Sequence, residues 1–202
     1  MPILTVLAGP NGAGKTRFSQ LLFERKILSV LPFNPDVVDV EFPSMLSQFL
    51  TYECESAINE NRDFAFECNL RKGQLQQINQ FKEKNYTINL VYFYLEDLIL
   101  SEQRVKYRVE IEKGNFVNAE SIQDNFYSGL KNLDNTFDFW DSLLLINNSK
   151  QVSLDSGADL EISLIVEKGK FCKVHRDFPP EKLILFLPLL AQEIKKFRGV
   201  SL

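Results

Sequence analysis

Residues 9–16 of the chain read Gly-Pro-Asn-Gly-Ala-Gly-Lys-Thr and match the pattern G-x-x-x-x-G-K-[ST] at every fixed position. Glycines let such a loop adopt backbone angles that other residues avoid, and they bring N–H groups close to phosphate oxygens. The loop opens a helix, so that the positive end of the helix dipole faces the anion. The pattern therefore requires a strand, this loop and a helix, in that order.

The flanking sequence provides that order. Residues 3–7 are apolar and rich in β-branched side chains, as expected of a buried parallel strand. After the loop, apolar residues recur at near-helical spacing, at Phe18, Leu21, Leu22 and Ile27. A glycine-rich turn that matched the pattern by chance would not be followed by such a helix. The predicted phosphate-binding residues are Gly9, Pro10, Asn11, Gly12, Ala13, Gly14, Lys15 and Thr16. Lys15 is expected to reach the outer phosphates, and the Thr16 hydroxyl to ligate a magnesium ion.

Strands alternate with helices along most of the chain. The predicted strands are 3–7, 29–33, 63–67, 88–95, 143–146, 162–166 and 171–174, the last two forming a hairpin. The predicted helices follow the loop and cover about 43–59, 75–81, 98–113 and 119–133, with a last helix that starts after Pro180 and that Pro188 kinks or divides. This alternation predicts an α/β fold with a mostly parallel central sheet, helices on both faces and a small C-terminal β-hairpin plus helix. With no internal repeat and no linker, residues 1–202 are predicted to form one domain.

Composition narrows the function classes. The formal net charge of −4 disfavours a general nucleic-acid-binding surface. The three cysteines, Cys54, Cys68 and Cys172, are widely spaced and suggest neither a disulfide framework nor a metal site. No segment resembles a signal peptide, and no apolar run is long enough for a bilayer. We therefore expect a cytoplasmic protein without membrane contact.

Two carboxylates follow predicted strands, and ligands in open α/β sheets bind beyond the carboxyl ends of the strands. Asp36 follows the second predicted strand and Glu67 ends the third. One could act as a general base toward a substrate hydroxyl, and the other could hold the substrate or magnesium-bound water. Alternatively, Asp36 is a turn residue in Asn-Pro-Asp, and Glu67 is an exposed acid at a strand exit.

Arginines supply the remaining candidates. Arg104 and Arg108 are four residues apart and share one face of a predicted helix. They could stabilise a migrating phosphoryl group, or they could be surface charges paired with nearby glutamates. Arg71 follows the third strand and either closes the crevice or opens the next helix on its solvent side. His175, the only histidine, is expected to lie on the surface.

Several stretches together resemble the zeta toxin-like P-loop kinases, including the group often labelled predicted ABC-type ATPases. The resemblance covers about residues 2–149. The stretches are LAGPNGAGKT (7–16), FNPDVV (33–38), FAFECNL (64–70), RVKYRV (104–109), YSGLKNL (127–133) and INNS (146–149). It implies a P-loop NTPase sheet of nucleotide-kinase type that uses ATP and Mg²⁺, with a sugar hydroxyl of UDP-N-acetylglucosamine as acceptor in the characterised branch.

The resemblance also implies residue roles. Lys15 and Thr16 would be the phosphate-loop lysine and the magnesium hydroxyl, and Asp36 the acid that activates the acceptor hydroxyl. Substrate contacts would come from strand-end residues, here Glu67 and Asn69, and Arg71 is added to this group. Arg104 or Arg108 would hold the transferred phosphate.

The chain departs from this family at three places. A Gly-Gly-His turn is replaced by Lys113-Gly114-Asn115, and arginines are replaced within Gln123-Asp124-Asn125-Phe126. Asp-Asn-Ser becomes Asn147-Asn148-Ser149. Three functions therefore remain: a zeta-type small-molecule kinase, a kinase of another acceptor such as a nucleoside or polynucleotide end, or a nucleotide-binding module with little catalysis. An antitoxin-like protein is a candidate partner.

Overall fold

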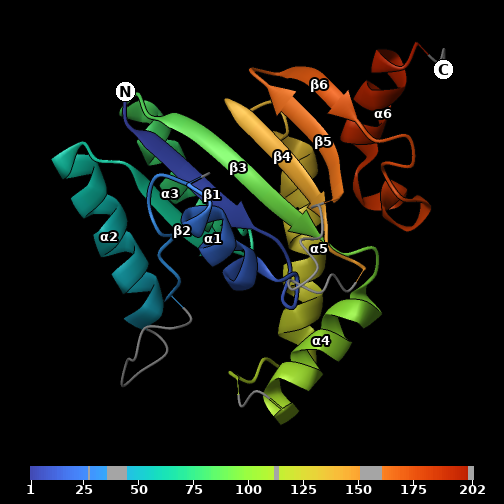
Figure 1. Ribbon diagram of the computed structural model, residues 1–202, viewed down its shortest axis with the longest axis horizontal. Helices are drawn as coiled ribbons and strands as arrows, with labels where there is room; N and C mark the ends of the chain where they lie inside the picture. The colour runs from blue at the N-terminus through green and yellow to red at the C-terminus, as the bar shows by residue number, and fades with distance from the viewer. Residues whose placement is uncertain (27, 36–44, 112–113, 151–160, 200–202) are drawn as a thin grey trace.

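The computed structural model describes residues 1–26, 28–35, 45–111, 114–150 and 161–199 (Figure 1). Its centre is a six-stranded sheet in the order β2-β1-β3-β4-β5-β6. The strands are β1 (Ile3–Ala8), β2 (Phe64–Cys68), β3 (Thr87–Tyr94), β4 (Ser142–Asn147), β5 (Glu161–Glu167) and β6 (Lys170–Val174). The strands β2, β1, β3 and β4 pair in parallel, whereas β5 and β6 pair antiparallel. The predicted mostly parallel sheet and C-terminal hairpin are confirmed.

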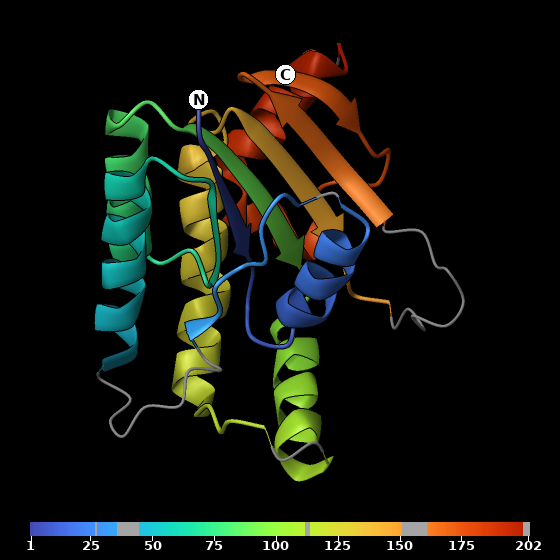
Figure 2. The same cartoon turned by 60° about the vertical axis from the view of Figure 1, so that its left-hand side comes forward.

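Helices cover both faces of the sheet, as Figure 2 shows from the side. The helices are α1 (Lys15–Glu24), α2 (Leu46–Glu60), α3 (Lys72–Glu83), α4 (Leu98–Ile111), α5 (Ala119–Thr136), the 3-10 helix η4 (Glu181–Phe186) and α6 (Pro188–Phe197). On one face, Phe18 of α1 stacks on Phe93 of β3 with ring centroids 5.3 Å apart. On the other face, Gly129 of α5 packs closely against Tyr92, the residue of β3 that precedes Phe93. A Cβ added to Gly129 would lie 2.8 Å from the Tyr92 hydroxyl oxygen. Alternation along β3 thus gives each face its own helix layer.

One predicted strand needed correction. Residues 29–33 do not form a strand, because only Phe33 bridges to Phe66 at the outer side of β2. Pro32 lacks an N–H group, so a continuous ladder could not pass through this position. The predicted effect of Pro188 is confirmed. It divides the C-terminal helix into η4 and α6 and begins α6, where its missing N–H removes no helical hydrogen bond.

The parallel strands bring four chain segments to one edge of the sheet. β1, β2, β3 and β4 all end there, at Ala8, Cys68, Tyr94 and Asn147. The loop after β1 and the segments after β2 and β4 therefore meet at the same edge, which is where ligands bind in open α/β sheets. Among the described residues, no helix is long and apolar enough to span a bilayer.

Candidate functional site

The loop of residues 9–14 joins β1 to α1, which begins at Lys15. Gly12 and Gly14 have φ angles of 73° and 82°, values that favour glycine. At Gly9, with φ 148°, a Cβ would lie 2.2 Å from the backbone oxygen of Phe93, so that no larger residue fits. The glycines of the pattern therefore allow both the backbone angles and the close packing of this loop against β3.

Lys15 folds its side chain back over the loop. Its Nζ donates hydrogen bonds to the carbonyl oxygens of Gly9 (2.8 Å) and Pro10 (3.1 Å), and to Asn69 Oδ1 (3.1 Å). The ammonium group is thus held at the mouth of the loop, and Asn69, from the exit of β2, is one of the groups that hold it. This arrangement places a positive charge where a bound phosphate chain would lie.

Next to the loop, Glu67 collects hydrogen bonds from three side chains. Its Oε2 accepts from the Thr16 hydroxyl (2.7 Å) and from Asn34 Nδ2 (3.1 Å), and its Oε1 accepts from the Ser19 hydroxyl (2.7 Å). Glu67 is only 4% exposed, so these donors compensate for the water that the carboxylate has lost. The Thr16 hydroxyl donates its proton to Glu67 and accepts from Asn34 Nδ2 (2.9 Å), so its oxygen keeps one lone pair for a metal ion.

Thr16 and Glu67 suit Mg²⁺ better than a metal ion whose ligands all come from the protein. Among the residues that the structure covers, no group of three or more His, Cys, Asp or Glu side chains could hold a metal ion. Mg²⁺ usually keeps several waters and is bound through one or two protein oxygens together with substrate phosphates. The Thr16 hydroxyl supported by Glu67 fits that mode of binding.

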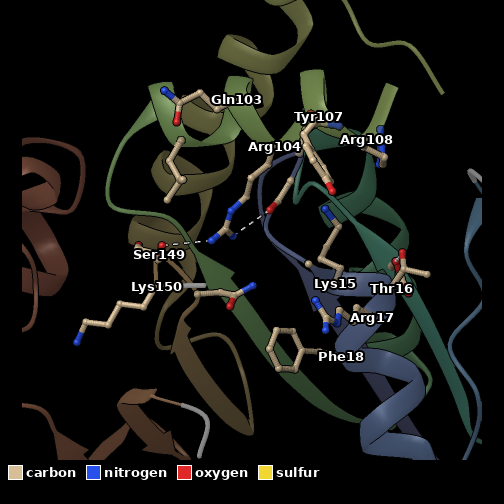
Figure 3. Close-up of a pocket in the computed structure, with 16 residues that line it drawn as sticks. Lys15, Thr16, Arg17, Phe18, Gln103, Arg104, Tyr107, Arg108, Ser149 and Lys150 are labelled. Atoms are coloured by element: carbon tan, nitrogen blue, oxygen red, sulfur yellow. Dashed lines mark hydrogen bonds between the residues drawn. The ribbon is translucent and has the colours of Figure 1, made fainter. Parts of the chain in front are cut away.

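A cavity of about 790 Å³ opens beside the loop (Figure 3). One wall is α4, which contributes Gln103, Arg104, Tyr107 and Arg108, and the opposite side is formed by the loop and the start of α1. The exit of β4 supplies the residues from Asn148 to Lys150. Among the described residues, the lining includes five cationic residues, Lys15, Arg17, Arg104, Arg108 and Lys150, and one acidic residue, Glu67. The described part of the lining is therefore electropositive, although the chain as a whole is acidic.

The two arginines of α4 differ in their contacts. Arg104 donates from Nη1 to the carbonyl oxygen of Gly12 (3.3 Å) and from Nη2 to that of Ser149 (3.2 Å), as drawn in Figure 3. Burial lowers the pKa of Arg104 from its usual value, yet a guanidinium remains charged at neutral pH. Arg108 donates from Nη2 to the carbonyl oxygen of Asn115 (3.1 Å). Its Nε is buried, and no hydrogen-bond partner for it lies within the described parts of the chain.

The remaining predicted site residues fall in different places. Arg71 pairs with Asp124 of α5 at 2.8 Å, half exposed, and is not part of the cavity lining. Glu67 lies on the Thr16 side of the loop, and Asn69 contacts Lys15. His175 is partly exposed and lies beside Asp177, as expected of a surface histidine. Asp36 lies outside the described residues.

Sequence reasoning missed several residues that contact the loop or the Glu67 cluster. They are Ser19, Asn34, Ser101, Asn125 and Asn148. Ser19 could have been found, because it follows Thr16 by three residues and shares its face of the helix. Ser101 and Asn125 carried no signal, since their loop partner, Asn11, lies 90 and 114 residues away in the chain.

Solved structures with a similar fold were found. Two structures of the AvrRxo1-ORF1:AvrRxo1-ORF2 complex, one native and one with ATP, give TM-scores of 0.61 and 0.58 at 16% and 17% identity, and the match covers 94% of this chain. The PezAT toxin–antitoxin system of Streptococcus pneumoniae gives 0.52 at 14% identity over 96% of this chain and 88% of that one. A Chloroflexus aurantiacus protein provisionally assigned as a kinase gives 0.51 at 13% identity over 77% of this chain and 91% of that one.

These likenesses define a P-loop kinase fold, and the predicted resemblance to zeta toxin-like kinases is confirmed at the level of the fold. The chain spans only 63% of the length of the AvrRxo1 chains that it matches. No known protein-family profile matches the sequence, and no curated protein matches it.

Proposed function

We propose that the protein is an ATP-dependent kinase that transfers the terminal phosphate of ATP to a hydroxyl group of a small molecule. The observation that carries this proposal is the Thr16–Glu67 pair, which lies beside Lys15 in a cavity with two arginines on its opposite wall. Phosphoryl transfer requires little covalent chemistry from the protein, and positioning together with positive charge supplies most of the catalysis.

The chain offers matching groups for each part of Mg²⁺-ATP. The loop and the first N–H groups of α1 can bind the phosphates, together with Lys15. The Thr16 hydroxyl can bind Mg²⁺, and Glu67 orients that hydroxyl. When bound, Mg²⁺ neutralises charge on the outer phosphates. Arg108 lines the cavity and can contact the phosphate that is transferred.

The acceptor side is proposed from the resemblance. There Asp36 would act as general base toward the acceptor hydroxyl, and a UDP-N-acetyl sugar is the acceptor to test first. Arg71 and Asn69 are proposed substrate contacts, although in the structure Arg71 contacts Asp124 and Asn69 contacts Lys15. We also propose an antitoxin-like protein partner, because the names of two similar structures describe a two-protein complex and a toxin–antitoxin system. The cytoplasmic location is proposed from the three widely spaced cysteines.

A second candidate is a nucleotide-binding module with little catalysis. The observation that favours it is the segment 123–126 of α5, which carries no arginine. Asn125 of this segment contacts Asn11 instead of adding a cation. In this case ATP would bind, but no acceptor would be phosphorylated.

The test uses ATP labelled on the terminal phosphate, with Mg²⁺, and a pool of small metabolites that includes UDP-N-acetylglucosamine. A kinase transfers the label to a pool component, and the Lys15→Ala variant abolishes the transfer. ATP binding in calorimetry without transfer to any acceptor would favour the binding module. Absence of ATP binding by the folded wild-type protein would refute both functions.

A further inference from the structure

Three consecutive carbonyl groups of the phosphate loop are each bonded by a side chain from another part of the fold. The bonds run from Ser101 Oγ to Asn11 O (2.6 Å), from Arg104 Nη1 to Gly12 O (3.3 Å) and from Asn148 Nδ2 to Ala13 O (2.8 Å). Two of the donors come from α4 and one from the exit of β4. The loop is thus held from outside its own strand–loop–helix unit, over separations of 90, 92 and 135 residues.

These bonds determine the direction of the N–H groups that follow the carbonyls. In a planar trans peptide, the C=O of one residue and the N–H of the next point to opposite sides. Bonds at Asn11 and Ala13 therefore turn the N–H groups of Gly12 and Gly14 away from Ser101 and Asn148. Both glycines line the cavity, and glycine alone would let these peptide planes rotate at little cost.

The donors are buried to different extents. Ser101 is fully buried and Asn148 is 8% exposed, and an added Cβ on Gly14 would lie 2.7 Å from Asn148 Nδ2. Buried polar groups of this kind are kept where they make hydrogen bonds, because an unpaired one destabilises the fold. Arg104 is only partly buried, yet it is committed at both Nη atoms to backbone carbonyls.

A fourth contact reaches the loop from α5. Asn125 Nδ2 donates to Asn11 Oδ1 at 2.7 Å, and Asn125 is 5% exposed. The backbone oxygen of Asn11 is bonded by Ser101, so backbone and side chain of this one loop residue are held by two different helices. Asn125 lies in the segment where the zeta toxin-like proteins often carry arginine, and here the position supports the loop instead.

We propose that Ser101, Arg104 and Asn148 are positioning residues that preorganise the phosphate loop for a nucleoside di- or triphosphate. Arg104 acts through the loop, and Arg108 is the arginine of α4 that contacts the transferred phosphate. The proposal rests on the nucleotide-binding function above and deepens it. It predicts that the two arginines, although one helical turn apart, contribute to different steps.

The first measurement is ADP affinity by calorimetry, because ADP occupies the loop but lacks the phosphate that is transferred. Ser101→Ala and Asn148→Ala should each weaken ADP binding about tenfold, which corresponds to about 1.4 kcal/mol. Arg104→Ala should weaken it similarly, and Arg104→Lys should restore part of the loss, because an ammonium can still bond a carbonyl. Arg108→Ala should leave ADP affinity within about twofold of wild type and lower kcat.

Matched controls come from hydroxyl and amide side chains whose hydrogen bonds, among the described residues, stay within their own helices. Ser56→Ala on α2 and Asn135→Ala on α5 remove such bonds far from the loop and should leave ADP affinity unchanged. Thermal unfolding of every variant identifies losses that come from unfolding. Wild-type ADP affinity in folded Ser101→Ala and Asn148→Ala would overturn the proposal, and equal ADP losses in Arg104→Ala and Arg108→Ala would overturn the division between the arginines.

The second measurement does not depend on nucleotide binding. Amide hydrogen exchange of the peptide that contains residues 9–16, in the nucleotide-free protein, should be faster in Ser101→Ala and Asn148→Ala than in wild type and controls. If the wild-type protein binds neither ADP nor ATP, the proposed function is wrong, and the exchange rates still decide whether the loop is held from outside. Equal exchange in all variants would overturn the positioning role.

Discussion

Replacing Glu67 by glutamine tests whether this carboxylate serves the metal side of the site. The structure gives Glu67 three hydrogen-bond donors, Thr16, Ser19 and Asn34. Glutamine keeps the size and shape, and the two hydroxyl groups can rotate so that one of them accepts from the new NH₂ group. Ser19 also has a second acceptor, the backbone oxygen of Thr16 at 2.9 Å. The variant should therefore fold and lose stability by about 1 kcal/mol or less.

The effect on nucleotide binding should depend on magnesium. A hydrogen bond to a charged group contributes about 1.5–3 kcal/mol, so weakening the support of the Thr16 hydroxyl should lower affinity for Mg²⁺-ATP about 10- to 100-fold. Without Mg²⁺, the substitution removes a negative charge beside the phosphates. Affinity for ATP in the presence of a chelator should then stay equal or increase, since like charges repel.

Calorimetric titration of ATP with Mg²⁺ and with chelator, on Glu67→Gln and wild type, measures both effects. Glu24→Gln is the control, because Glu24 is exposed at the other end of α1. Equal changes with and without Mg²⁺ would refute the assignment of Glu67 to the metal side. A change confined to the KM of the acceptor would instead support a direct substrate contact.

Three further predictions follow. Lys15→Ala should reduce ATP affinity severely while the fold persists, and unchanged affinity of a folded variant in calorimetry would contradict the nucleotide site. Asp36→Asn should bind ATP normally but lower transfer about 10²- to 10⁴-fold, whereas wild-type transfer rates would leave Asp36 as a turn residue. Burial raises the pKa of the Cys54 and Cys68 thiols to about 12, so both stay protonated at pH 8. Exposed Cys172 alone should then react quickly with a thiol reagent, and fast reaction of all three in the native protein would contradict this packing.

The order of strands and helices was largely predictable, because it depends on local patterns. Residues 88–95 were predicted as a strand from their near-continuous apolar character, and β3 spans Thr87–Tyr94. The hairpin predicted from 162–166 and 171–174 is formed by β5 and β6. The strand predicted at residues 29–33 from their apolar character was wrong, because Pro32 interrupts the hydrogen bonding that a strand needs. The apolar pattern of these residues is local, whereas a strand also needs continuous hydrogen bonding to β2. Only a single bridge, at Phe33, is formed there.

The sequence alone determined the phosphate loop, because its glycine positions, Lys15 and Thr16 lie within one local segment whose geometry depends on backbone angles. Tertiary structure alone decided what surrounds it. Glu67 lies 51 residues from Thr16 in the chain, and Asn148 lies 135 residues from Ala13, yet the parallel array β2-β1-β3-β4 brings both to the loop. The different contacts of Arg104 and Arg108 were equally beyond sequence reasoning. Both lie on one helical face, and only the packing of α4 against the loop and the exit of β4 gives Arg104 two carbonyl oxygens as partners.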